Sequence, residues 1–596
     1  MNKEINCLLD ELGSEPTYTD MQRVGNKLLK LPVPEDLPAT KQVRIVLASS
    51  FTIDPIAPAL AVECHKIGLH PIIQIDGFNL YQSHILDSNS SLYKFKPDIV
   101  LLSAELSSVM PLEYSIIEDA EIRIKKLVED FKRHSSALLV MHNFVVPSHF
   151  PFTILQNERQ SQFVDSINKR LADIYKSDSQ VRILDFEALC AYHGKSRITN
   201  SKLHYLGAME ISESFLPIVA KQYIAYIKAL KGLTHKCIVL DGDNTLWGGI
   251  LGEDGIDGIN LSNHGVGSEY YDFQKAILAL HKRGVILAIN SKNNQSDVME
   301  VLHEHPDMML REKHFASLQI NWNDKAANLQ AIAKELNIGL DSLVFMDDSP
   351  IERAWIRQSL PEVLVVDLPS DPMLYAQTLE GLTDFEILSL TEEDTQRGAL
   401  YATERVRHEF KKTSDNFEEF LAGLKTVLTI GVAEIKDIPR VAQLTRRTNQ
   451  FNMTTHRYTD AETMEMVLSQ DILVYTLRVR DVFGDSGLVG LIILKKGEVW
   501  KIDTFLMSCR VLGRTIEQAF LNEVLADAIN QGAFMTEGRF IPTAKNVLAS
   551  NFYKEFGFTF VTENEEHILW QLDVSKWTPK RSEWFTIEWS VKDAAS

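Results

Sequence analysis

Apolar runs alternate with stretches of helix-like spacing in the first part of the chain, up to about residue 225. Each run is short, rich in branched residues and followed by polar ones, as buried strands of a parallel sheet are. The four runs are VRIVLASS, PDIVLLSAEL, ALLVMHN and VRILDF. Because strands that alternate with helices build parallel sheets, this pattern predicts an α/β domain.

A second set of apolar runs begins near residue 232, and its first member leads directly into two carboxylates. CIVL precedes Asp241 and Asp243 in a D-x-D-x-T pattern that ends at Thr245. Open α/β sheets bind ligands at the carboxyl ends of their strands. One carboxylate can attack phosphorus or hold a metal while the other transfers a proton, and the Thr245 hydroxyl can contact a phosphate oxygen. A solvated turn is the alternative interpretation.

Three further features follow in the order that a phosphoryl-transfer site needs. In VILAINSKNN an apolar strand ends at Ser291, whose hydroxyl and following N–H groups can cradle a phosphate. Lys325 opens a segment of helical period, where its ammonium can neutralise phosphate charge. LVFM leads into Asp347 and Asp348, which offer the hard oxygen ligands that Mg²⁺ takes. Taken singly, these residues also fit a helix N-cap, a solvated lysine and a turn.

From about residue 420 the pattern changes to strand, turn and strand, followed by an Arg-x-x-Gly loop that opens a helix. LVGLIILKKGEVWKIDTFLMSCRVLGRTIEQAFLNEVLADA carries this pattern, and the N–H groups at the helix start can bind a pyrophosphate. The charged stretch TEEDTQRGALYATERVRHEFKK before it predicts a helical linker. In FGDSGLVG, Asp485 either orients a base or lies in a hairpin turn, and we favour the turn.

Composition narrows the class of protein. The chain has 596 residues, of which 45% are hydrophobic, so it exceeds the size of a single core and predicts three or four domains. Five scattered cysteines without a C-x-x-C pattern argue against disulfides and zinc. The net charge of −20 argues against binding of nucleic acid or an anionic membrane. An acidic start and the lack of a long apolar run favour the cytoplasm.

With these motifs the chain resembles the haloacid dehalogenase (HAD) superfamily and, within it, the FkbH-like proteins of subfamily IIIC. The resemblance covers nearly the whole chain, through DGDNTLWGGILGEDG, SKNN, INW-x-x-K, LDSLVFMDDSPIER, TNQFN, FGDSGLVG, IDTF-x-x-SCRVLGR and FIPTAKN. It implies that Asp241 is the nucleophile and Asp243 the general acid/base. It implies phosphate contacts from Thr245, Ser291, Lys292 and the catalytic Lys325. It implies a Mg²⁺ ion held by Asp241, Asp243, Asp347 and Asp348.

The resemblance also divides this α/β chain into three domains and a linker. Residues 1–230 look like an SGNH-hydrolase-like α/β domain, and residues 231–390 like a capless HAD-like Rossmannoid parallel sheet. Residues 391–419 form the helical linker, and residues 420–596 a GNAT-like α+β domain that binds pantetheine, a likeness that NVLASNFYKEFGF supports. The HAD motifs lie too close together for a folded lid, so the hairpin at Trp247 is the one flap expected.

The SGNH-like plan in the first domain is incomplete. Ser49 or Ser50, Asn143 and His204 match it loosely, but Gly-Asp-Ser is missing and the histidine has no Asp three residues before it. We therefore expect a noncatalytic recognition or assembly domain.

FkbH-like proteins that act as glyceryl transferases take a three-carbon acyl unit from 1,3-bisphosphoglycerate and remove phosphate. They load the glyceryl group on the phosphopantetheine thiol of an acyl carrier protein for polyketide-type extension, and the resemblance implies the same here. Many members have a cysteine before the motif serine, where this chain has Asn290. Cys509 is then the candidate acyl-bearing residue, or else a small core residue. Further substrate contacts are implied for Asn449, Arg510, Gly513 and Arg514.

Other functions fit the same motifs. The chain is alternatively a capless Mg²⁺-dependent phosphatase that acts on a small phosphate ester or a phosphoprotein. A GNAT-type acyl-CoA acyltransferase and a noncatalytic assembly protein are further alternatives. An acidic carrier would need a basic patch on this acidic chain, and the candidates cluster in the last third: Arg446, Arg447, His456, Arg457, Arg510, Arg514 and Lys545.

Overall fold

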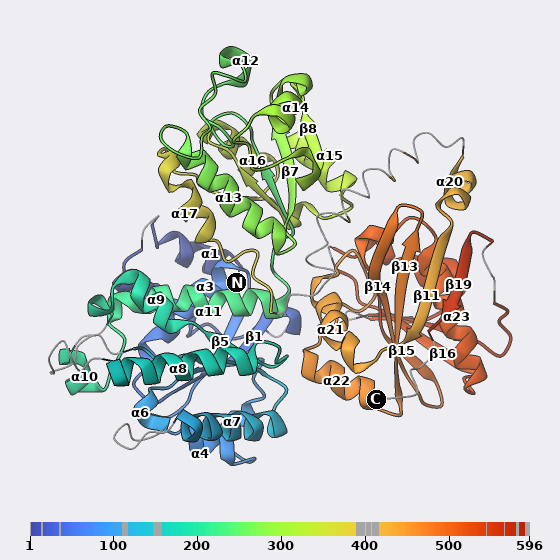
Figure 1. Cartoon of the computed structure of the whole chain (residues 1–596). Coiled ribbons are helices and arrows are strands. Elements are labelled where there is room, and N and C mark those ends of the chain that lie inside the picture. The colour runs from blue at the N-terminus through green and yellow to red at the C-terminus, as the bar shows by residue number, and fades with distance from the viewer. Residues whose placement is uncertain are drawn as a thin grey trace. The chain divides into compact units, whose positions relative to one another are not determined.

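The computed structural model shows two compact units, one formed by Met1–Leu233 and a larger one formed by almost all of the chain after it, and each is described by itself (Figure 1). No helix among the described residues is long and apolar enough to cross a membrane. The described residues are 2–13, 16–34, 37–109, 117–146, 158–198, 201–388, 400, 407, 410, 416–543, 545–564, 567–579 and 583–590.

A five-stranded parallel sheet, the β1–β5 sheet, forms the centre of the first unit. Its strand order is β2-β1-β3-β4-β5. Four strands confirm the apolar runs of the sequence, whereas β2, which has a proline as its second residue, was not anticipated. The strands are β1 Gln42–Ser49, β2 His70–Ile75, β3 Ile99–Ser103, β4 Leu138–His142 and β5 Val181–Leu184.

Helices cover both faces of the β1–β5 sheet. On one face α4 (Tyr81–Leu86), α7 (Ile117–His134) and α8 (Glu158–Tyr175) share a core with alternate residues of β1, β3 and β4. A second group of helices, α2 (Tyr18–Leu28), α3 (Ala57–Lys66) and α11 (Leu216–Lys231), packs together. Gly25 of α2 lies so close to α3 that a Cβ there would meet the Pro58 carbonyl oxygen at 2.1 Å, so only glycine fits.

A second parallel sheet, the β6–β10 sheet, follows in the larger unit. Its order is β10-β9-β6-β7-β8, so β6 pairs with β7 on one side and with β9 on the other. These three strands confirm the apolar runs before the predicted site residues, and β8 and β10 extend the sheet at its edges. The bounds are β6 Cys237–Leu240, β7 Ile286–Ser291, β8 Phe315–Ile320, β9 Leu343–Met346 and β10 Leu364–Val365.

The residues of β6 alternate between two cores on the faces of this sheet. Ile238 and Leu240 contribute to the core under α13 (Ser268–Lys282) and α14 (Gln295–Glu304). Cys237 and Val239 contribute to the core under α15 (Lys325–Glu335) and α16 (Pro350–Ser359). Helices on both faces explain why β6, β7 and β9 read as continuous apolar runs.

The C-terminal part of the larger unit is a mixed sheet, the β11–β19 sheet, with helices between its strands. Its order is β17-β18-β16-β15-β14-β13-β11-β19, and most pairs are antiparallel. This α+β architecture agrees with the fold class predicted for the third segment. The strands are β11 Thr426–Val432, β13 Ile472–Asp481, β14 Gly484–Lys495, β15 Trp500–Met507, β16 Met535–Phe540, β17 Thr559–Glu563, β18 Ile568–Asp573 and β19 Phe585–Trp589, and the helices include α21 Ile438–Arg447, α22 Asp460–Leu468, α23 Ile516–Asn530 and α24 Phe552–Phe556.

A two-residue strand, β12 (Phe451–Asn452), fills the place where β15 and β16 part. These two strands pair in parallel only over Trp500–Ile502. Beyond that point β12 pairs with the end of β15, and the Met453 N–H donates to the Phe505 carbonyl at 3.0 Å. The Ile541 N–H in turn donates to the Met453 carbonyl at 2.8 Å, so the segment bridges the gap.

The turn between β13 and β14 lies earlier in the sequence than predicted. The β13–β14 hairpin turns at Val482 and Phe483, and Asp485 lies within β14, so the turn expected at Gly-Asp-Ser-Gly was placed too late. The two strands pair as far as Asp481 and Gly484, so the glycine-rich stretch belongs to β14 and only two residues are left for the turn. The predicted linker helix within residues 391–419 lies mostly outside the described residues.

Candidate active site

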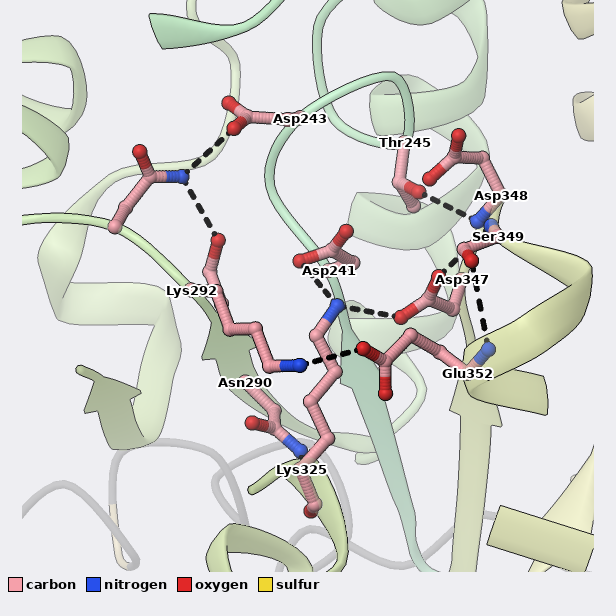
Figure 2. Close-up of polar contacts among 12 residues, drawn as sticks. Asp241, Asp243, Thr245, Asn290, Lys292, Lys325, Asp347, Asp348, Ser349 and Glu352 are labelled. Carbon is pink, nitrogen blue, oxygen red and sulfur yellow. Dashed lines mark hydrogen bonds and ion pairs between the residues drawn. The ribbon is translucent and has the colours of Figure 1, made fainter. Parts of the chain in front are cut away.

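The carboxyl ends of β6, β7 and β9 bring the predicted polar residues to one edge of the β6–β10 sheet (Figure 2). Asp241 follows β6, Ser291 ends β7 and Asp347 follows β9. All three residues are buried. The end of β6 is bonded to the end of β9, since the Asp241 N–H donates to the Met346 carbonyl at 3.1 Å. Neighbouring parallel strands therefore produce the grouping that the sequence predicted.

Lys325 lies between two of these carboxylates. Its Nζ is 2.9 Å from Asp241 Oδ1 and 2.6 Å from Asp347 Oδ2 (Figure 2). The lysine is the first residue of α15, because Asp324 caps that helix by accepting hydrogen bonds from the Ala326 and Ala327 N–H groups. The helix start thus delivers a buried ammonium, only 3% exposed, into the acidic cluster.

Burial and the neighbouring opposite charges shift the pKa values of Asp241 and Lys325 in opposite directions. Burial, reinforced by the Asp347 charge and opposed by Lys325, raises the pKa of Asp241 to about 7. For Lys325, burial opposes the charged form, yet Asp241 and Asp347 outweigh it and raise the pKa of the ammonium. The lysine is therefore charged at neutral pH.

Asp241, Asp347 and Asp348 form a group of acidic side chains that could hold a metal ion. One oxygen from each lies within 4.8 Å of the others. Burial, followed by repulsion from Asp347, raises the pKa of Asp348. Three carboxyl groups thus share one ammonium, and a bound divalent cation would favour their charged forms. Three hard carboxylate oxygens around one small volume suit Mg²⁺, which takes one or two carboxylates together with substrate and water oxygens.

Asp243 lies apart from that group. Its Oδ1 accepts hydrogen bonds from Trp247 Nε1 at 3.0 Å and the Leu251 N–H at 3.1 Å, and its Oδ2 accepts one from Asn293 Nδ2 at 3.0 Å. The carboxylate predicted as a fourth metal ligand is thus engaged by other donors and is not in the acidic group found among the described residues. Trp247 is fully buried, so the expected flap is an anchored part of the core.

The predicted phosphate contacts surround the same edge. The Thr245 hydroxyl accepts a hydrogen bond from the Asp348 N–H at 3.1 Å, and Ser291 Oγ accepts one from Asn293 Nδ2 at 3.1 Å. The Lys292 ammonium forms an ion pair with Glu352, with Nζ 2.6 Å from Oε1 (Figure 2). Glu352 lies in the first turn of α16. Sequence reasoning missed Asn293, although it lies in the same SKNN motif as Ser291.

Asn290, which stands where the resemblance led us to expect cysteine, has a structural partner. Its Nδ2 donates to the Lys325 carbonyl at 2.9 Å, and its Oδ1 accepts from Asn328 Nδ2 at 3.0 Å. The side chain is fully buried. Asn290 therefore holds the start of α15, and with it Lys325, against the end of β7.

Two comparisons with known proteins match large parts of this chain. The model of the FkbH N-terminal domain matches residues 65–228. The N-terminal part of the protein BF1531 from Bacteroides fragilis, which contains a phosphatase domain complexed with Mg, is similar with 27% identity and a TM-score of 0.56, over 63% of this chain and 99% of its own. The chain therefore resembles an FkbH-like protein of the HAD type.

Two other comparisons add little. The ribosomal-protein-S18-alanine N-acetyltransferase from Escherichia coli is similar to the FkbH-like chain with 12% identity and a TM-score of 0.21, over 26% of this chain and 99% of its own. No curated protein sequence matches the chain.

The SGNH-like residues of the FkbH-like chain are occupied by structural bonds. Ser49 Oγ donates to the Ser103 carbonyl at 2.7 Å, and Ser50 Oγ accepts from the Glu105 N–H at 2.9 Å. Asn143 donates from Nδ2 to Asp185 and accepts at Oδ1 from the Glu187 N–H, so its amide ties the end of β4 to the start of α9 (Phe186–His193), the helix after β5.

The C-terminal candidates of the FkbH-like chain lie in the β11–β19 sheet domain. Cys509 opens a short 3₁₀ helix after β15 and is half-buried. Arg514 Nη1 donates to Asp481 Oδ2 at 3.2 Å, and Arg514 Nη2 donates to the Arg510 carbonyl at 3.0 Å. Gly513 takes a φ of +75°, which suits the tight loop before α23. Asn449 Oδ1 accepts from Arg457 Nη2 at 2.8 Å.

The basic patch expected for an acidic partner is not formed as predicted. Arg446, Arg510 and Arg514 are buried, with 4–6% of their surface exposed. Sequence reasoning counted their charges but could not see that α21 and the loop before α23 turn these side chains inward. Of the seven basic candidates, these three cannot contribute a surface patch.

Proposed function

We propose that this FkbH-like protein is a Mg²⁺-dependent enzyme that takes a glyceryl unit from 1,3-bisphosphoglycerate, removes phosphate and loads the acyl group on the thiol of an acyl carrier protein. The observation that carries the proposal is the buried cluster of Asp241, Lys325, Asp347 and Asp348 at one sheet edge. The resemblance of the motifs to glyceryl-transferring FkbH-like proteins supplies the substrate and the carrier.

The acidic side chains fit the metal that the B. fragilis relative contains. Asp241, Asp347 and Asp348 would hold the Mg²⁺ ion, since each presents an oxygen to the same small volume. When bound, the ion neutralises charge on the phosphate being transferred. Lys325 adds a fixed positive charge beside the same oxygens.

Phosphate removal begins with attack of the Asp241 carboxylate on the phosphorus of the ester. The P–O bond to the glyceryl oxygen breaks, Asp243 protonates that oxygen, and an aspartyl-phosphate remains on Asp241. Asp243 then takes a proton from water, which attacks the same phosphorus and releases inorganic phosphate with a regenerated Asp241. The Thr245 and Ser291 hydroxyls would contact the phosphate oxygens.

Acyl transfer needs a thiol, and Cys509 is the candidate on the enzyme. Its thiolate attacks the C1 carbonyl carbon, the bond to the C1 phosphate breaks, and a thioester forms. The carrier thiol then displaces Cys509 from the carbonyl carbon. Burial raises the pKa of the Cys64, Cys190 and Cys237 thiols, which makes them poor nucleophiles. Cys7 is exposed on the N-terminal helix.

The test is an incubation of the full chain with 1,3-bisphosphoglycerate, Mg²⁺ and a phosphopantetheinylated carrier, followed by mass spectrometry. We expect the carrier to gain a glyceryl mass. Phosphate release without a gain on any of several carriers would replace the proposal with a capless phosphatase. Acetyl transfer from acetyl-CoA would replace it with an acyltransferase of the GNAT type.

A Cys509→Ala variant tests the thioester step. We expect it to release phosphate through Asp241 but to lose both the covalent enzyme adduct and carrier loading, whereas Cys7→Ala as the matched control keeps all three. Carrier loading at the wild-type rate in Cys509→Ala would show that the carrier thiol attacks the acyl phosphate directly.

A further inference from the structure

The N-terminal domain contains a cavity of about 320 Å³ that the proposed reaction does not use. It lies at the carboxyl ends of β1, β3 and β4, since Phe51, Ala104 and His142–Val146 line it. From β1 the chain adds β2 on one side of the sheet and then β3, β4 and β5 on the other. Open α/β sheets bind ligands in the crevice where the strand order reverses in this way. The cavity therefore lies where this type of sheet forms a binding site.

Most of the cavity wall is apolar. Aromatic and branched side chains from several loops and helices contribute to it, and ligand pockets are lined in the same way. The main apolar contributors are Phe51, Phe144, Val146, Val164, Phe186 and Ile211. A molecule that fills this volume thus gains most of its binding free energy from an apolar body.

The charged groups at and beside the cavity include three carboxylates but only two basic side chains. Lys195 forms an ion pair with Glu187 and donates to the Val146 carbonyl at 2.8 Å. Glu210 pairs with His204. Glu105 lines the cavity, and no described residue bonds to its carboxylate. Burial and repulsion from Glu210 raise the pKa of Glu105, and His204, which Glu210 also binds, opposes this only in part. A cation bound beside Glu105 would favour the charged carboxylate.

The floor of the cavity offers a polar group that adds no positive charge. His142 is only 6% exposed, and its Nε2 lies 2.8 Å from the Tyr223 hydroxyl and 3.3 Å from Ser103 Oγ. Its ring stacks on Phe186 with the centroids 4.4 Å apart. Burial lowers the pKa of His142 to about 3, so the imidazole is neutral and does not repel a cation. Its Nδ1 has no hydrogen-bond partner within the described part of the chain.

We propose that this cavity binds a small organic amine, with the protonated amine on the Glu105 carboxylate and an apolar body against the aromatic and aliphatic wall. Ser50 and Asn143 line or adjoin the site but are tied to backbone and helix-cap partners, so the cavity serves binding and not hydrolysis. Ligand binding gives the N-terminal domain a role independent of the acid cluster at Asp241.

The first test uses the full chain and calorimetric titration with hexylammonium, hexanoate and 1-hexanol at physiological salt. We expect hexylammonium to bind with saturation and the other two to bind at least about tenfold more weakly. From butyl- to hexylammonium, each added methylene should tighten binding about fourfold. Equal binding of hexanoate or hexanol, or no saturation by any alkylammonium, would overturn the proposal.

The second test changes the carboxylate and keeps its shape. Glu105→Gln should weaken hexylammonium binding by about tenfold or more, because a charge-assisted hydrogen bond is lost. Glu129→Gln, on the exposed side of α7, removes the same charge elsewhere on the domain and should leave the affinity unchanged. Equal affinities of Glu105→Gln and Glu129→Gln would mean that alkylammonium binds through the overall negative charge, and would end the proposal.

Discussion

The ammonium of Lys325 lies 2.6 Å from a carboxylate oxygen of Asp347, and neither side chain is open to solvent. The same ammonium contacts Asp241 at 2.9 Å. A buried charge is tolerated only with a partner, so these three residues stabilise one another as a set. The strand ends and the start of α15 are held together by this set as well as by packing.

Replacing Lys325 by methionine should lower the free energy of unfolding by about 3–5 kcal/mol at neutral pH without divalent cations, because two buried carboxylates lose their cation. Added Mg²⁺ should recover part of the loss, since it can take the place of the missing charge. Urea unfolding with and without Mg²⁺ measures both effects. Lys334→Met, on the exposed side of the same helix, is the control, and an equal small change in both variants would refute the role of Lys325.

Asp241→Asn should reduce phosphate release to the background rate, because an amide cannot attack phosphorus. The variant should fold, since Lys325 keeps its bond to Asp347. A colorimetric phosphate assay beside a circular dichroism spectrum checks both expectations. Asp272→Asn, on the exposed side of α13, should behave as the wild type. Undiminished release by Asp241→Asn would eliminate this nucleophile.

Chelation should stop phosphate release, and added Mg²⁺ should restore it. Asp348→Asn removes one of the three grouped carboxylates, so half-maximal activity should need about tenfold more free Mg²⁺. Titrating activity against free Mg²⁺ for both proteins measures the shift. Activity that survives complete chelation would contradict a metal at Asp241, Asp347 and Asp348.

His142 should make the chain less stable in acid. Burial lowers its pKa in the folded state to about 3, below its ordinary value of 6.5, so only the unfolded state takes up this proton between those values. The contribution to stability is complete above pH 6.5 and falls by about 1.4 kcal/mol per pH unit as the pH drops toward 3. Urea unfolding of the wild type and His142→Asn should give curves whose difference narrows over this range. Parallel curves would refute the prediction.

Part of the active site could be predicted because strand ends are visible in sequence. Continuous apolar runs mark β6, β7 and β9, and the polar residues that follow such runs meet at one sheet edge, as Asp241, Ser291 and Asp347 do. Asp324 before Lys325 also agrees with a helix N-cap, which fixes where the lysine enters. Local pattern therefore indicated both the fold and the carboxylate–lysine cluster.

The rest depended on tertiary contacts that no local pattern carries. Nothing in the sequence shows that Asn293 and Trp247 donate hydrogen bonds to the Asp243 carboxylate. Nor does it show that Asn290 donates one to the Lys325 carbonyl. Charge counting also placed Arg510 and Arg514 on the surface, whereas they are buried. Partner choice for polar side chains is decided by the folded arrangement.

The short strand β12 has a consequence for the rate at which anything can enter between β15 and β16. A ligand that needs the edge of β15 must first displace Phe451 and Asn452 and break the bonds that Met453 makes to both sides. Its observed association rate would then level off as ligand concentration rises, at the rate with which the segment opens. Its apparent dissociation constant would equal the intrinsic constant divided by the fraction of molecules in which the segment is open.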